Sequence, residues 1–94
     1  MPRPRARRMT KFKPQVTYFK PRAVPLRQIE EVDLWIEELE ALRLCDLLGL
    51  GQAKAAEKME TSQSTLQRIL ESARKKVAEA LIQGKAIRVN NPST

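Results

Sequence analysis

Residues 52–70 read Gln-Ala-Lys-Ala-Ala-Glu-Lys-Met-Glu-Thr-Ser-Gln-Ser-Thr-Leu-Gln-Arg-Ile-Leu, and the other predicted elements are arranged around them. It predicts a short helix over 52–59, a tight turn at Glu60–Thr61 and a second helix that starts at Ser62. A serine at that position caps a helix, because its hydroxyl accepts a backbone N–H that would otherwise stay unpaired. The small side chains of Ala55 and Ala56 let the second helix cross the first closely. This arrangement is typical of a helix-turn-helix, whose second helix enters the major groove of DNA.

The regions on either side of this stretch also have helical spacing. After it, apolar residues at 66, 69, 70, 73, 77, 80 and 81 form one stripe, which predicts a helix that runs to Ile82 or Gln83 and stops at Gly84. Before it, apolar residues at 36, 39, 42, 44, 47 and 48 predict a helix over Ile36–Leu48. Acidic residues at 37, 38 and 40 suit the first turns of that helix, where the helix dipole favours negative charge. Gly49 is expected to end it in a left-handed conformation and Gly51 to cap the next helix.

Three short segments read as strands. Val16–Phe19 is β-branched and aromatic, whereas Ile29–Leu34 could be a second extended piece or the lead-in to a helix. Ala86–Val89 alternates as a strand does, so it could pair with either of the first two. The sequence therefore predicts a mainly α fold, with a three-helix helix-turn-helix core and a small β-sheet from the N-terminal segment and the C-terminal strand. One domain is expected over 15–90, between a flexible, proline-containing basic arm (1–14) and a frayed tail (91–94).

The charge of the chain is unevenly distributed. The net charge is +7; residues 1–22 hold eight basic and no acidic residues, 23–51 two basic and seven acidic, and 52–94 eight basic and four acidic. Two basic regions thus flank an acidic one, which predicts a polyanionic partner that contacts the first and third regions.

Several kinds of site are excluded. The chain has no His and a single Cys, Cys45, so a zinc site of thiolates and imidazoles, an internal disulfide and His-dependent catalysis are ruled out. Cys45 is expected to be a small buried hydrophobe, and one unpaired Cys suits a reducing, cytoplasmic compartment. There is no Gly-rich phosphate loop, no signal peptide and no apolar run near the roughly 18 residues of a membrane span. We therefore expect no enzyme activity, no cofactor, no small-molecule ligand and no membrane partner.

The expected partner is double-stranded DNA. Glutamine can pair with adenine, arginine with guanine and serine with either, so base contacts are predicted for one face of the second helix, at Gln63, Ser64, Gln67 and Arg68. Phosphate contacts are predicted for Gln52, Ser62, Arg74, Lys75, Arg3, Arg5, Arg7 and Arg8. Each of these residues could instead belong to an ordinary solvated surface.

Seven motifs are specific when taken together: Met1-Pro-Arg-Pro, Val16-Thr-Tyr-Phe-Lys-Pro, Leu39-Glu-Ala-Leu-Arg-Leu, Gly49-Leu, Ala55-Ala-Glu-Lys-Met, Arg68-Ile-Leu-Glu-Ser-Ala-Arg-Lys-Lys-Val-Ala-Glu-Ala-Leu and Gly84-Lys-Ala-Ile-Arg. Across nearly the whole chain they resemble a family of small uncharacterised prokaryotic proteins, predicted to bind DNA through a helix-turn-helix similar to region four of bacterial sigma factors. The resemblance implies the fold class, a cytoplasmic prokaryotic setting and DNA binding, but no target. From the geometry of residues 52–70 and the charge distribution, we expect a transcriptional regulator. In this chain residues 60–63 are Glu-Thr-Ser-Gln, so Glu60–Thr61 and Gln63 differ from the family's usual Gly-Val-Ser-Arg. A glutamate at positive φ would cost about 1 kcal/mol.

Two alternatives stay open. The apolar stripe 66–81 is longer than base reading requires, so it could serve a protein partner or form a homodimer. RNA is the other alternative, since a basic arm suits any phosphate chain. However, the four aromatics (Phe12, Tyr18, Phe19 and Trp35) are not spaced as a platform on which bases stack.

Overall fold

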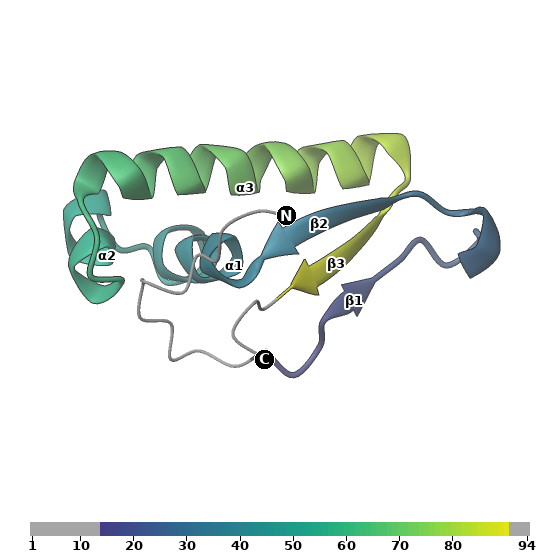
Figure 1. Cartoon of the computed structure of the whole chain (residues 1–94), viewed down its shortest axis with the longest axis horizontal. Coiled ribbons are helices and arrows are strands. Elements are labelled where there is room, and N and C mark those ends of the chain that lie inside the picture. Colours follow the sequence, from purple (N-terminus) through teal and green to yellow (C-terminus); the bar gives the residue numbers. More distant parts are fainter. Residues whose placement is uncertain (1–13, 91–94) are drawn as a thin grey trace.

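The computed structural model describes residues 14–90, which form three α-helices, two short turns of other helix types and a three-stranded sheet (Figure 1). Residues 1–13 and 91–94 lie outside the described residues, and with them the predicted tail and all but Pro14 of the predicted basic arm. In chain order the elements are β1 (Tyr18–Phe19), the 3-10 turn η1 (Leu26–Gln28), β2 (Glu31–Trp35), α1 (Ile36–Leu42), the π-helix η2 (Arg43–Leu47), α2 (Gln52–Lys58), α3 (Gln63–Gln83) and β3 (Ala86–Asn90).

The sheet has the strand order β1-β3-β2, with β3 in the centre. β3 runs antiparallel to β1, where Phe19 lies opposite Ile87, and parallel to β2, where Leu34 lies opposite Val89. The two pairings that the sequence offered for the C-terminal strand therefore form at the same time. The prediction of a mainly helical fold with a small sheet is confirmed.

The long helix α3 spans the molecule and packs against different partners at its two ends. In Figure 1 its first half lies over α1 and α2, and its second half lies over the sheet. One buried cluster fills the first contact: Ala41, Leu44, Ala55, Ala56, Met59, Leu66, Ile69 and Leu70. A second cluster joins α3 to the sheet: Leu34, Ile36, Ala73 and Val89. No helix within residues 14–90 is both long enough and apolar enough to cross a membrane.

The predicted helix over Ile36–Leu48 is interrupted. α1 stops at Leu42, and η2 continues with a wider turn in which the N–H of Leu48 donates to the carbonyl of Arg43, five residues back, at 2.9 Å. The wider turn rotates the later side chains, so Leu47 is 77% exposed and Leu48 is exposed too, where the spacing predicted core residues. Gly49 then ends the helix at φ 78°, as predicted, and Leu50 packs back on the first cluster.

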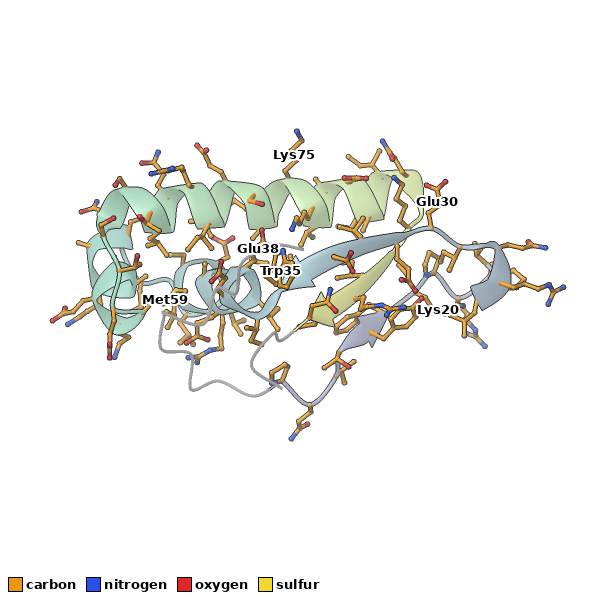
Figure 2. All side chains as sticks on the ribbon, in the orientation of Figure 1. Lys20, Glu30, Trp35, Glu38, Met59 and Lys75 are labelled. Atoms are coloured by element: carbon orange, nitrogen blue, oxygen red, sulfur yellow. The ribbon has the colours of Figure 1, made fainter. Side chains whose placement is uncertain are left out.

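A buried carboxylate ties α1 to the middle of α3. Glu37, Glu38 and Glu40 occupy the first turns of α1, as expected from the helix dipole, but all three are buried. The Glu38 carboxylate accepts hydrogen bonds from the backbone N–H of Trp35 (2.8 Å), the hydroxyl of Ser72 (2.6 Å) and the ammonium of Lys76 (2.9 Å). Figure 2 shows Glu38 beneath the middle of α3. Its burial is tolerated because its oxygens are satisfied from three sides.

Candidate nucleic-acid interface

The turn between α2 and α3 is tight and regular. The N–H of Thr61 donates to the carbonyl of Ala56 (3.0 Å), and the N–H of Glu60 donates to that of Glu57 (3.1 Å). This pair of bonds closes the end of a helix when the following residue is left-handed, a position that usually holds glycine. Glu60 occupies it at φ 56°, so the positive φ anticipated from the sequence is confirmed. The turn has kept its geometry despite strain that costs about 1–2 kcal/mol in a residue with a Cβ.

Ser62 fixes the start of α3. Its Oγ accepts the backbone N–H of Thr65 at 3.1 Å and donates to the Thr65 hydroxyl at 2.8 Å, which confirms the predicted cap. The same Oγ lies 3.3 Å from that of Ser64. Because the Ser62 hydroxyl is already used within the helix, the phosphate contact predicted for it would have to share that oxygen with the cap.

α2 holds the first turns of α3 through small and flexible side chains. Ala55 and Ala56 are buried at the crossing, as predicted, together with Met59 and Leu66, which have no exposed surface. Met59 belongs to no motif predicted from the sequence, although its position four residues after Ala55 places it on the same helix face. A methionine adapts to an irregular gap between helices. The contact between α2 and the first turns of α3 is therefore fully packed.

The four predicted base-contact residues lie together on the outer side of α3. Gln63, Ser64, Gln67 and Arg68 are all exposed, opposite the buried arc of the helix. Because consecutive helical residues are about 100° apart, these four fall within an arc of about 140°. Among residues 14–90, no carboxylate forms an ion pair with Arg68. The arrangement presents two amides, one hydroxyl and one unengaged guanidinium on a single exposed surface.

The predicted phosphate contacts have different environments. Lys75 is exposed, and Figure 2 shows it pointing away from the body of the protein. Gln52 is half-buried at the start of α2. The predicted arginines at 3, 5, 7 and 8 lie outside the described residues.

Arg74, also predicted to contact phosphate, is held by an acid that the sequence did not point to. Its guanidinium binds Asp46 of η2 with two bonds, Nε to Oδ2 at 3.1 Å and Nη2 to Oδ1 at 2.7 Å. These bonds hold the pKa of Asp46 below its ordinary value and raise that of Arg74. Arg74 could reach a phosphate only by sharing or leaving this pairing.

The Tyr18 side chain on β1 is engaged in internal contacts. The Tyr18 hydroxyl donates to Glu31 at 2.7 Å, which raises the pKa of the phenol, and the guanidinium of Arg88 lies 6.0 Å from the centre of the Tyr18 ring. Arg88 also pairs with Glu31 at 2.9 Å. This part of the described surface is a cross-strand ion cluster and not an open platform for bases.

Cys45 is half-buried beside the first cluster. Burial raises the pKa of its thiol, and the negative charge of Asp46 raises it further. A thiol with a raised pKa is a poor nucleophile at neutral pH. Cys45 therefore contributes packing, in keeping with its expected role, although it is less buried than predicted.

Comparison with known proteins gives a family. A family model described as "Protein of unknown function DUF134" matches residues 1–92. The chain is 61% identical to a "UPF0251 protein" of Moorella thermoacetica over 89 residues, which cover 95% of this chain and 60% of that protein. It is 55% identical to "UPF0251 protein TTE1845" of Caldanaerobacter subterraneus, covering 95% and 75% of the two chains. It is 53% identical to a "UPF0251 protein" of Halothermothrix orenii, covering 94% and 65%. The chain thus spans less than two thirds of two of these relatives, and no solved structure matches it.

Proposed function

This chain belongs to the DUF134 family, and we propose that it binds double-stranded DNA through a helix-turn-helix formed by α2, the Glu60–Thr61 turn and α3. The observation that carries the proposal is the surface formed by Gln63, Ser64, Gln67 and Arg68. The packed contact with α2 and the capped helix start hold these residues in place at the N-terminal end of α3. Preorganised polar side chains on a rigid helix are what direct reading of base edges requires.

In the proposed complex the first two turns of α3 lie in the major groove. Gln67 pairs with an adenine and Arg68 with a guanine through two hydrogen bonds each, and Gln63 and Ser64 touch neighbouring base edges. Lys75, Gln52 and the arginines at 3, 5, 7 and 8 contact phosphates, which position the helix but carry no sequence information. The protein would act as a transcriptional regulator in the prokaryotic cytoplasm, where chromosomal DNA lies.

The distribution of charge supports a polyanionic partner. The acidic segment 23–51 would repel DNA if its charges faced outward together. Instead, three of its seven acids (Glu37, Glu38 and Glu40) are buried, and Glu38 and Glu40 pair with Lys76 and Arg43 at 2.9 Å each. The other four are exposed, and of these Glu31 pairs with Arg88 and Asp46 with Arg74. Of the exposed residues between 63 and 75 on α3, Glu71 alone is acidic. The outer side of α3 therefore offers little repulsion to phosphates.

The test is a selection of bound sites from random duplexes, followed by salt-dependent binding to the selected site. Parent protein is expected to bind with a steep salt dependence. The double variant Gln67→Ala/Arg68→Ala removes two base contacts worth about 1–3 kcal/mol each, so affinity for the selected site should fall at least ten-fold and sequence preference should flatten. If the double variant selects the same sites as the parent, the assigned reading surface is wrong.

A matched control is available on η1. Arg27 and Gln28 are an adjacent, exposed arginine–glutamine pair outside α2 and α3, so Arg27→Ala/Gln28→Ala should bind the selected site like the parent. Removal of residues 1–13 should weaken all duplexes alike, because phosphate contacts do not read sequence. Structured RNA that competes as well as the selected duplex would overturn the choice of DNA.

A further inference from the structure

A single acidic residue, Glu71, lies on the surface of α3 that the proposed function assigns to DNA. It is the one acid among the exposed residues between 63 and 75. At about 100° per residue, it is turned by about 40° from Gln67 and by about 60° from Arg68, so it lies between these two around the helix axis. Lys75, four residues later on the same side, points away from the body of the protein in Figure 2. Glu71 therefore faces the same partner as Gln67 and Arg68.

The Glu71 carboxylate has no ion pair within residues 14–90. This is notable because Arg68 and Arg74 lie three residues before and after it, a spacing that brings opposite charges together on a helix. Arg74 is held elsewhere: its pKa is raised mainly by hydrogen bonds to Asp46 and least by the charge of Glu71. Glu79, the other acid of α3, does form an ion pair, at 2.7 Å. Glu71 thus keeps both carboxylate oxygens for a partner.

The chemistry of a carboxylate limits what Glu71 can contact in a major groove. An ionised carboxylate only accepts hydrogen bonds, and losing water without gaining a donor is costly. Guanine presents two acceptors in the groove, thymine presents an acceptor and a methyl group, and adenine presents an acceptor beside its amino group. Cytosine alone presents a donor, its N4 amino group, with no acceptor beside it. Cytosine is therefore the base that suits Glu71.

We propose that Glu71 is a specificity-determining residue, which selects cytosine by accepting a hydrogen bond from its N4 amino group. The inference rests on the proposed function and adds a third base contact to those of Gln67 and Arg68. Along α3, Glu71 is about 4.5 Å beyond Arg68 and about 6 Å beyond Gln67. Successive base pairs are about 3.4 Å apart. The cytosine therefore lies within about two base pairs of the guanine that Arg68 contacts.

A carboxylate beside DNA could instead act through its charge alone, by repelling phosphates. That role would weaken binding to every duplex alike, because phosphates carry no sequence information. Glu71→Gln separates the two roles. Glutamine has nearly the same size and no charge, and its amide donates as well as accepts, so it pairs with adenine. Loss of repulsion would strengthen binding to all sequences, whereas loss of a cytosine contact changes the preferred base at one position.

The experiment is a selection of bound sites from random duplexes with the parent, Glu71→Gln and Arg68→Ala. At one position, Glu71→Gln should lower the preference for cytosine about ten-fold and shift it toward adenine. That position should lie within about two base pairs of the one at which Arg68→Ala loses its preference for guanine. Glu57, an exposed acid on α2, gives a matched control. Glu57→Gln makes the same change of charge and should select the parent's site.

The outcomes separate this inference from the proposed function. If Glu71→Gln selects the parent's site and binds all duplexes more tightly, Glu71 acts only by repulsion and the inference is wrong, while the proposed function stands. A change of preference more than about three base pairs from the Arg68 position is beyond the reach of Glu71 and overturns the inference too. A parent that binds no duplex overturns both. Thermal unfolding of each variant checks that these exposed substitutions leave the fold intact.

Discussion

The two ends of α3 belong to one helix and one apolar stripe, yet they meet their surroundings differently. The first half buries large side chains, Leu66, Ile69 and Leu70, and shows only polar residues outside. The second half buries the small side chains of Ala73 and Ala80 and leaves Leu81 and Ile82 in solvent. The spacing of the apolar residues thus determines which side of a helix can be buried, but the neighbouring elements determine how much of that side they cover.

The difference has a packing cause. Between α3 and the helices α1 and α2, branched side chains and Met59 fill the space. Over the sheet, alanines let α3 approach β2 and β3 closely, so little room remains for larger residues on the inner side. Leu81 is in register with the stripe, but it lies beyond the covered strands and lines a groove beside β1. The stripe 66–81, considered from the sequence as a docking surface, is thus mostly the protein's own core.

The largest expected effect on stability comes from comparing the same Leu→Ala substitution at the two ends of α3. Leu66→Ala removes a fully buried side chain and leaves a cavity, so the free energy of unfolding should fall by about 2–5 kcal/mol. Leu81→Ala removes a side chain that is mostly in water, so it should change stability by less than about 0.5 kcal/mol. Urea unfolding at a protein concentration too low for association measures both. Equal losses of stability at the two sites would contradict the difference in burial between the two ends of α3.

A smaller effect of opposite sign is expected at the turn before α3. Glu60→Gly relieves a left-handed backbone that costs about 1–2 kcal/mol with a Cβ, although the glycine gains entropy in the unfolded chain. The net expectation is a gain of about 0.5–1 kcal/mol, measured by thermal or urea unfolding. Glu57→Gly, an exposed position inside α2, is the control and should lose about 1 kcal/mol. A loss at both positions would show that the Glu60 side chain makes a compensating contact.

Much of this local geometry could be predicted, because single residues specify it. The cap at Ser62, the left-handed stops at Gly49 and Gly84, and the strain at Glu60 each follow from one side chain and its neighbours. The helical period likewise predicts the exposure of the four base-contact candidates, Gln63, Ser64, Gln67 and Arg68. Their role in binding DNA remains a prediction, since exposure alone does not name a partner.

Other features depend on contacts between distant parts of the chain and could not be predicted. The π-turn of η2 needs only a one-residue shift in hydrogen bonding, and no glycine or proline marks it; Arg43–Leu47 reads as ordinary helix. That shift exposes Leu47 and directs Asp46 to Arg74, which is 28 residues away in sequence. Likewise, the sequence predicts only that Glu38 lies in the first turns of a helix. It does not indicate Ser72 and Lys76 as its hydrogen-bond partners.

The Asp46–Arg74 pair gives the smallest expected effect, which sharpens the proposed DNA contact at the boundary between the two halves of α3. Asp46 is ionised at neutral pH like any ordinary aspartate, and Arg74 lowers its pKa further, so its charge is lost only in acid. Asp46→Asn frees the guanidinium of Arg74 while it barely alters stability, since the pair is exposed. Duplex binding at low salt should strengthen a few-fold, with one more phosphate contact seen as a change of about one in the salt slope.

Arg74→Ala alone should then weaken binding little, and adding it to Asp46→Asn should cancel the gain. If Arg74→Ala in the parent already removes a full phosphate contact, Arg74 leaves Asp46 on binding and makes the phosphate contact that the sequence predicts.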